Sequence, residues 1–361
     1  MSRTRHCQVQ IKRAIAACFD FFDMHPAPNR PIIFDCHGPE TVYRLLTIEV
    51  RHVQPQSRMN RLTDHSKPLI FRAKPCDQDT HAHLVLDCQM PWLAGPQWQV
   101  LAHGASLDSW KDNGFIEAPG LIAGVLVGKG HQSLEAETCD LYRELFALTH
   151  GLNRYRIWNY VPQINTMVDG MENYVSFNYG RHQAFIEQFG KISSNDLSAA
   201  SALGTQGGSL ILAFVAGPDP VRHYENPLQT PASRYPVCYG KKSPLFARGS
   251  VVQAANGSTS WHLSGTASVR RAKTIGRDFT HQMNVTLENI DRMLDEMAVP
   301  TVRNAAWKVY LRDRRDLKAC QERLAAAYPN EVAQMMFLEA DICRRDLLLE
   351  IEAIFHQNPS C

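Results

Sequence analysis

From residue 133 to residue 355, segments typical of helices alternate with segments typical of strands. Residues 133–150 and 279–298 carry apolar side chains at helical spacing, and residues 208–216 (G-S-L-I-L-A-F-V-A) form a short apolar run typical of a buried strand. This alternation predicts an α/β (α+β) fold in which helices pack on a mixed β-sheet. The other expected elements are strands at 154–162, 259–268, 306–312, 334–340 and 347–355, and helices at 181–189 and 315–327.

The first 130 residues are dominated by turns and strand-like runs. Pro26, Pro28 and Pro31 exclude a helix in their neighbourhood. We expect a domain boundary just before the helix at 133–150, which Ser133 caps and Gly151 ends, so that an N-terminal domain covers 1–131 and a C-terminal domain covers 132–361. Strands of the N-terminal domain are expected at 41–50, 82–88, 97–103 and 121–127.

The composition argues against several classes of partner. A net charge of +2 gives no electrostatic reason to expect binding to nucleic acid. The longest apolar runs, 121–127 and 210–216, are too short to span a bilayer, which needs about 20 residues. Ten cysteines without a C-x-x-C spacing, in a chain with no apolar signal segment, indicate reduced thiols in a cytoplasmic protein.

Residues 338–355 (L-E-A-D-I-C-R-R-D-L-L-L-E-I-E-A-I-F) combine an apolar composition with five acidic side chains. In a strand at 347–355, Glu350 and Glu352 share one face, while Leu349 and Ile351 lie on the other. Two carboxyl groups on one poorly solvated face raise each other's pKa, which makes a general acid available at neutral pH. The alternative interpretation is a solvated sheet face.

Three further clusters carry side chains suited to binding a ligand. One expected strand carries Arg154, Arg156, Trp158, Asn159 and Tyr160, with Arg181 downstream. Such arginines bind a ligand carboxylate, form an internal salt bridge, or lie at the surface with only their aliphatic part buried. Residues 235–249 (Y-P-V-C-Y-G-K-K-S-P-L-F-A-R-G) have no periodicity and are typical of a long loop with a defined shape. Such a loop either builds a binding site or is an ordinary surface connection. Residues 264–268 (S-G-T-A-S) are small enough for a ligand or another backbone to approach closely.

Taken together, these clusters resemble the chorismatase family, RidA-like enzymes that cleave chorismate. The family segments R-x-W-N-Y, G-R, Y-P-x-x-Y-G-x-x-S-P-x-F-A-R, S-G-T-A-S and D-I-C-R-x-D-L-L-x-E-I-E are matched in order at 156–160, 180–181, 235–248, 264–268 and 341–352. In one departure, Val269-Arg270-Arg271 stands where relatives continue with V-G-H. The closest branch in this resemblance is that of the xanthomonadin-type, pigment-pathway synthases of 3- or 4-hydroxybenzoate.

The resemblance implies two RidA-like (chorismate-mutase-like) domains, of which the N-terminal one would be a degenerate copy assigned by continuity alone. It implies that Glu350 protonates the enolpyruvyl ether of chorismate and that Cys343 lies near the ring during aromatisation. No metal and no organic cofactor is needed for this chemistry. The substrate-binding residues that it implies are Arg156, Tyr160, Arg181, Tyr235, Tyr239, Arg248 and Gly249.

In the family, a cysteine in the terminal segment and a glycine after F-A-R accompany an aromatic product. Cys343 and Gly249 therefore favour hydroxybenzoate and pyruvate as products. Three alternatives stay open: a hydrolase that yields a dihydroxycyclohexadiene carboxylate, a non-catalytic RidA-like protein that binds a small carboxylate, and a RidA-like imine deaminase, which the length of the chain disfavours. The expected state is a monomer or a small homo-oligomer, and its small-molecule partner would be chorismate.

Overall fold

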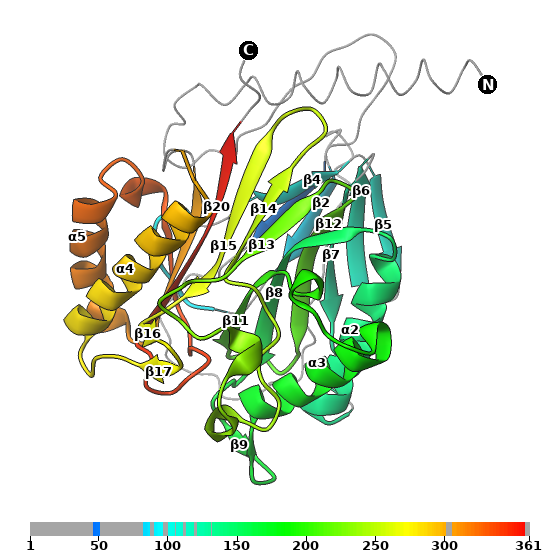
Figure 1. Cartoon of the computed structure of the whole chain (residues 1–361), viewed down its shortest axis with the longest axis horizontal. Coiled ribbons are helices and arrows are strands. Elements are labelled where there is room, and N and C mark those ends of the chain that lie inside the picture. The colour runs from blue at the N-terminus through cyan, green and yellow to red at the C-terminus, as the bar shows by residue number, and fades with distance from the viewer. Residues whose placement is uncertain are drawn as a thin grey trace, which may run out of the picture.

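The computed structural model describes residues 46–50, 82–86, 90–96, 100–104, 106–110, 113–118, 121–130, 132–300 and 305–357. Two large β-sheets lie between two pairs of helices (Figure 1). Within the described residues, the α-helices are α2 (Leu134–Leu148), α3 (Asn173–Phe189), α4 (Phe279–Glu296) and α5 (Leu317–Ala327). None of these described helices is both long and apolar enough to cross a membrane.

The first large sheet has six strands in the order β11-β8-β12-β7-β6-β5. Its strands are β5 (Ser106–Trp110), β6 (Asn113–Ala118), β7 (Leu121–Val127), β8 (Asn153–Pro162), β11 (Ala199–Thr205) and β12 (Ile211–Gly217). The second has seven strands in the order β13-β14-β15-β20-β18-β19-β3. Its strands are β3 (Trp92–Ala94), β13 (Val221–Tyr224), β14 (Gly249–Gln253), β15 (Thr259–Thr266), β18 (Ala306–Leu311), β19 (Met336–Glu339) and β20 (Leu349–Gln357).

The remaining described strands form three smaller sheets. A three-stranded sheet holds β1 (Leu46–Val50), β2 (Ala82–Leu86) and β4 (Val100–Gly104). The other two are hairpins, one of β9 (Met167–Val168) with β10 (Met171–Glu172), and one of β16 (Val269–Arg270) with β17 (Lys273–Thr274).

The two large sheets contain the same topology twice. In the first, the hairpin β6–β7 is followed by α2, β8, α3 and β11, and β12 then inserts antiparallel between β7 and β8. In the second, the hairpin β14–β15 is followed by α4, β18, α5 and β19, and β20 inserts antiparallel between β15 and β18. In both, the edge strand is parallel to its neighbour, β11 to β8 and β19 to β18.

The position of these copies bears on the domain boundary expected between residues 131 and 132. That point lies between β7 and α2, and β7 pairs with β12 in the same sheet. We therefore propose, in place of 1–131 and 132–361, that the repeating units cover 113–217 and 249–357. The segment 1–45 of the expected N-terminal domain lies outside the described residues.

Three buried clusters define the layers of the molecule. One packs the first sheet on α2 and α3, and another packs the second sheet on α4 and α5. The third lies between the two sheets and joins side chains such as Trp158 and Leu203 of the first to Tyr310 and Ile354 of the second. Alternate residues of each inner strand therefore face either the helices or the opposite sheet.

Most expected elements are confirmed to within a few residues, but α3 is longer than predicted. The sequence predicted a helix at 181–189, whereas α3 begins at Asn173. Its first half contains residues of low helix propensity, including Gly180. A Cβ on Gly180 would lie 2.0 Å from the carbonyl oxygen of Glu135, so close packing on α2 stabilises this half where propensity does not. The strands β3, β5, β6, β11, β13 and β14 and the two short hairpins were not predicted as separate strands.

Candidate active site

The expected alternation of β20 is confirmed. Leu349, Ile351 and Phe355 pack against the helix-covered side of the second sheet. Glu350 and Glu352 point the other way, toward the first sheet, and their residues are only 4% and 3% exposed. The interpretation as a solvated face is therefore wrong, and two carboxyl groups lie buried between the sheets.

Glu352 is held by five hydrogen-bond donors. One oxygen, Oε1, accepts hydrogen bonds from Trp158 Nε1 at 2.9 Å, Lys308 Nζ at 3.0 Å and Tyr310 Oη at 3.2 Å. The other, Oε2, accepts from Arg156 at 2.7 Å and from the Ser201 hydroxyl. Burial alone would raise the pKa of Glu352, but the charges of Lys308 and Arg156, with hydrogen bonds from Ser201 and Lys308, lower this pKa to about 2.

Glu350 has the opposite environment. Within the described part of the chain, no donor forms a hydrogen bond with its carboxyl group, which lies at the wall of a cavity. Burial raises the pKa of Glu350 to about 8, and the negative charge of Glu352 adds to this against the opposing charges of Arg156 and Arg248. Glu350 therefore keeps its proton at neutral pH.

The carboxyl group of Glu350 fits over Gly265, the glycine of the S-G-T-A-S segment. A Cβ on Gly265 would lie 1.9 Å from Glu350 Oε1 and 3.1 Å from Ser201 Oγ. The backbone N–H of Gly265 also donates to Ser201 Oγ at 3.0 Å. The small residue predicted to let a ligand or a backbone approach thus makes room for the carboxyl group itself.

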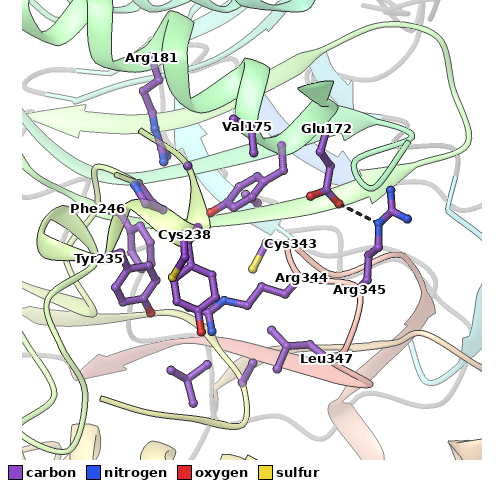
Figure 2. Close-up of a pocket in the computed structure, with 18 of the residues that line it drawn as sticks. Glu172, Val175, Arg181, Tyr235, Cys238, Phe246, Cys343, Arg344, Arg345 and Leu347 are labelled. Atoms are coloured by element: carbon purple, nitrogen blue, oxygen red, sulfur yellow. Dashed lines mark hydrogen bonds and ion pairs between the residues drawn. The ribbon is translucent and has the colours of Figure 1, made fainter. Parts of the chain in front are cut away.

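The cavity has a volume of about 640 Å³ and lies where the two copies meet. Its walls come from α3, from the loop at 232–248, from β11 and from the terminal segment before β20. Figure 2 shows Arg181 reaching into it from α3, with Cys343 and Arg344 on the terminal segment. Of the residues predicted from the sequence, it is lined by Arg181, Tyr235, Tyr239, Arg248, Cys343 and Glu350.

Four arginines and Lys241 line the cavity. Arg345 is paired with Glu172 of the same wall, and the other three arginines contribute positive charge. Arg181 is 1% exposed and donates to Asn178 Oδ1 at 2.6 Å, and Arg248 donates to the Tyr235 hydroxyl at 2.6 Å. Arg344, which the sequence analysis did not select, lies 4.0 Å from the ring centroid of Tyr239. Among the described residues, no carboxylate pairs with Arg181 or Arg344, and the nearest to Arg248 is Glu225 at 4.0 Å.

Three predicted site residues lie away from the cavity wall. Arg156 forms the internal salt bridge with Glu352 that the sequence analysis had left open as the alternative. Tyr160 is buried in the cluster between the sheets. A Cβ on Gly249 would point at Met297 of the α4 C-terminus, 2.4 Å from its sulfur, so Gly249 faces that helix and not the cavity.

Cys343 contributes a neutral thiol to the wall. Burial raises the pKa of this thiol to about 12, with a further contribution from Glu350, so the thiolate is not populated at neutral pH. The described cysteines, Cys139, Cys238, Cys320 and Cys343, are all free. Cys343 is therefore suited to contact or hydrogen bonding as a neutral thiol and not to nucleophilic attack.

Helix α4 holds the segments that flank the cavity. The Gln282 side chain donates to the carbonyl of Asp346 at 2.7 Å and accepts from the N–H of Leu348 at 2.9 Å. Asn289 donates to the carbonyls of Ala267 and Val269, both at 2.9 Å. At the departure from the family pattern, Arg270 is paired with Glu288 of the same helix.

The raised pKa of Glu350 predicts an effect on stability. Between about pH 4.5 and 8 the folded state binds this proton more tightly than the unfolded state, so the contribution of Glu350 to the free energy of unfolding falls as pH rises through that window. Glu350→Gln keeps the shape of the protonated group and removes the titration. We expect the variant to gain up to about 4 kcal/mol relative to wild type between pH 5 and pH 9, measured by urea unfolding.

The control for this measurement is Glu331→Gln, which alters a buried glutamate that accepts a hydrogen bond from the N–H of Ala305 at 3.2 Å, away from the cavity. A difference between Glu350→Gln and wild type that stays constant with pH would contradict the assignment of a raised pKa to Glu350.

Known protein families and solved structures include matches to this chain. Residues 112–216 match a family model described as "Chorismatase FkbO/Hyg5-like, N-terminal", and these residues span nearly all of the first copy. A solved crystal structure of a chorismatase is similar over 91% of this chain and 96% of its own, with a TM-score of 0.68 and 25% identity.

Two curated relatives come from Streptomyces hygroscopicus. A 3-hydroxybenzoate synthase is 35% identical over 219 residues, which are 55% of this chain and 62% of the relative. A chorismatase is 34% identical over 266 residues, which are 69% of this chain and 76% of the relative. At this identity and coverage, the chain belongs to the chorismatase family.

Proposed function

We propose that this protein cleaves chorismate to pyruvate and a hydroxybenzoate, with Glu350 as the general acid. The observation that carries the proposal is a buried carboxyl group, protonated at neutral pH, at the wall of a cavity lined by arginines. A relative named 3-hydroxybenzoate synthase supports the aromatic product. The experiment that tests the proposal is incubation of the purified protein with chorismate and identification of the products by chromatography and mass spectrometry.

Binding follows from charge. Chorismate carries two carboxylates, and Arg181, Arg344 and Arg248 are cations at the cavity wall, which Lys241 and the paired Arg345 also line. An arginine binds a carboxylate through two parallel hydrogen bonds, so these side chains can fix both the position and the orientation of a dianion. The neutral state of Glu350 avoids a repulsive charge beside that substrate.

The first chemical step is proton transfer to carbon. The Glu350 O–H gives its proton to the terminal methylene of the enolpyruvyl ether, which becomes the methyl group of pyruvate, and the ether carbon acquires oxocarbenium character. A general acid in this position contributes about 10²–10⁴-fold to the rate. Glu350 is left as a carboxylate.

The ring hydroxyl oxygen then bonds internally to the ring carbon that carries the side chain, the bond between that carbon and the ether oxygen breaks, and pyruvate leaves. One of the two bonds from the hydroxyl oxygen to the ring then breaks, and this oxygen carries its proton as the hydroxyl of the product. Loss of a ring proton makes the ring aromatic, and the Glu350 carboxylate is the group that takes this proton back. Hydroxybenzoate and pyruvate together have the atoms of chorismate, so no water is consumed. The alternative hydrolysis to a dihydroxycyclohexadiene carboxylate adds one water, and mass spectrometry distinguishes the two.

Replacing the acid tests the mechanism. Glu350→Gln is expected to lower kcat for pyruvate release by about 10²–10⁴-fold, and the wild-type rate should decrease as pH rises through about 8, because the protonated form is required. Pyruvate is measured with a coupled dehydrogenase assay. A variant with near wild-type pyruvate release would contradict the assignment, and a wild-type protein that binds chorismate without converting it would indicate a non-catalytic binding protein.

Cys343 tests the choice of product. If its thiol assists aromatisation of the ring, Cys343→Ala should shift the products from hydroxybenzoate toward a dihydroxycyclohexadiene carboxylate while pyruvate is still released. The ratio is read by mass spectrometry, with Cys320→Ala, a buried cysteine of α5, as the control. An unchanged product ratio would remove Cys343 from the mechanism.

Arg344 tests the binding of the dianion. Loss of a charged hydrogen-bond partner costs about 1.5–3 kcal/mol, so Arg344→Met should raise the KM for chorismate on the order of 10- to 100-fold. The neighbouring Arg345 is paired with Glu172 at 3.2 Å, and Arg345→Met is expected to have a smaller effect. Equal KM values for the two variants would speak against a specific role of Arg344.

The ring position of the product hydroxyl, the pigment pathway, the cytoplasmic location and the monomer or small homo-oligomer stay predictions from the sequence. Chorismate is the small-molecule partner in this proposal.

A further inference from the structure

The ion pairs beneath Glu350 form a buried cluster of Arg156, Lys308 and Glu352, which we name the Glu352 ion cluster. Lys308 and Arg156 have side chains that are each 1% exposed, and they donate to different oxygens of Glu352. Lys308 lies on β18 and Arg156 on β8, so the cluster connects the two large sheets. Neither Lys308 nor Glu352 lines the cavity, so these groups do not touch a ligand bound there.

Burying the charged groups of this cluster is unfavourable for the stability of the fold. Transferring charged groups from water to a protein interior carries a desolvation penalty that mutual attraction repays only in part, and apolar replacements of such pairs are often neutral or stabilising. Among the described residues, Glu352 is the only carboxylate within salt-bridge distance of Lys308. A function other than stability would explain why a lysine is buried at this position.

The geometry places this cluster beside the proposed acid. Glu350 and Glu352 are two residues apart on the same face of β20, and Tyr310, which donates to Glu352, is directly opposite Glu350 in the strand register. Ser201 donates to Glu352 and flanks the same Gly265 on which the Glu350 carboxyl group lies. The carboxylate of Glu352 accepts hydrogen bonds from five donors, whereas no donor among the described residues forms a hydrogen bond with the carboxyl group of Glu350.

We propose that Lys308 and Arg156 hold Glu352 as a fixed carboxylate, and that this ion cluster is a positioning device that keeps the single proton of the carboxyl pair on Glu350. Because a second negative charge beside Glu352 is unfavourable, the proton stays on the carboxyl group that faces the cavity. The inference deepens the proposed function and rests on it for its kinetic consequence. Arg248 is the other charged group that acts on Glu350. The remaining titratable side chains of its cavity wall are Arg181, Lys241, Arg344, Arg345, Glu172, Asp346, Cys238, Cys343, Tyr174, Tyr179, Tyr235 and Tyr239.

The test compares two variants that remove opposite charges. In Glu352→Gln the neighbouring cations are no longer balanced, so Glu350 ionises more easily and the alkaline limb of the kcat profile should move to lower pH by about one unit or more. At pH 7.5 kcat should fall about 3-fold or more and should recover toward pH 5.5, with little change in KM. In Lys308→Met the carboxylate of Glu352 loses a cation, so the proton is shared between Glu352 and Glu350. We therefore expect kcat to fall while the alkaline limb of the kcat profile does not move to lower pH.

The double variant Lys308→Met/Glu352→Gln removes both charges and should exceed Glu352→Gln in kcat at pH 7.5. Glu331→Gln is the control for loss of a buried carboxyl group and should leave the limb in place. A purely structural role predicts a uniform loss of kcat at all pH values in both single variants. That outcome would overturn the proposal.

A measurement without substrate separates this inference from the proposed function. The infrared carbonyl band of protonated Glu350 is identified as the band lost in Glu350→Gln and is titrated in each variant. The band should disappear at lower pH in Glu352→Gln than in wild type, and it should be weaker in Lys308→Met near pH 7. An unchanged titration would reject the role of the cluster even if chorismate is cleaved, and a shifted titration would support it even if chorismate is not.

Discussion

The salt bridges from Lys308 and Arg156 to Glu352 are the interaction on which the rest of the site depends. They bring charged side chains from three strands of two sheets to one point that is closed to solvent. Removing one member would leave a buried charge without its partner, which costs about 3–5 kcal/mol. The cluster therefore couples the relative position of the two sheets to the electrostatic environment of Glu350.

The duplicated topology explains why the site lies where it does. Each copy covers one face of its sheet with two helices, so the second face must be buried against another sheet. The inner faces meet in an apolar cluster, and the polar site lies beside it, where β11 of the first copy approaches β15 of the second. Ser201 comes from one copy and Gly265 and Glu350 from the other, so the described site requires both.

The periodic elements of this fold could be predicted from the sequence because their apolar residues repeat at regular spacing. β7 was predicted with its observed ends, and β20 with the correct face for each acid. β11 (A-A-S-A-L-G-T) was not predicted, because small residues give no alternation. The first half of α3 depends on packing against α2 across Gly180, a long-range contact that local propensity does not contain.

Glu350, Arg181 and Arg248 line the cavity, and their catalytic and substrate-binding roles stay predictions. Spacing alone could not show that Arg156 would form a salt bridge with Glu352. The roles of Lys308 and Ser201 could not be predicted from the sequence, because a single lysine or serine in a strand does not reveal which residues of the other sheet it will contact. Arg344 lies within the terminal family segment, and that segment was the signal from which it could have been found.

Gly249 shows how a residue can influence the cavity without lining it. It follows Arg248 directly, and it lies against Met293 and Met297 of α4. A side chain at this position would have to displace that end of α4 or move β14 away from it. The backbone of Arg248 is hydrogen-bonded to the backbones of Tyr224 and Ser264. A movement of β14 would therefore also move the Arg248 guanidinium at the cavity wall. The family resemblance implies that this glycine accompanies an aromatic product, and the structure offers one route for such an effect, the main-chain position of Arg248, because Gly249 does not line the cavity.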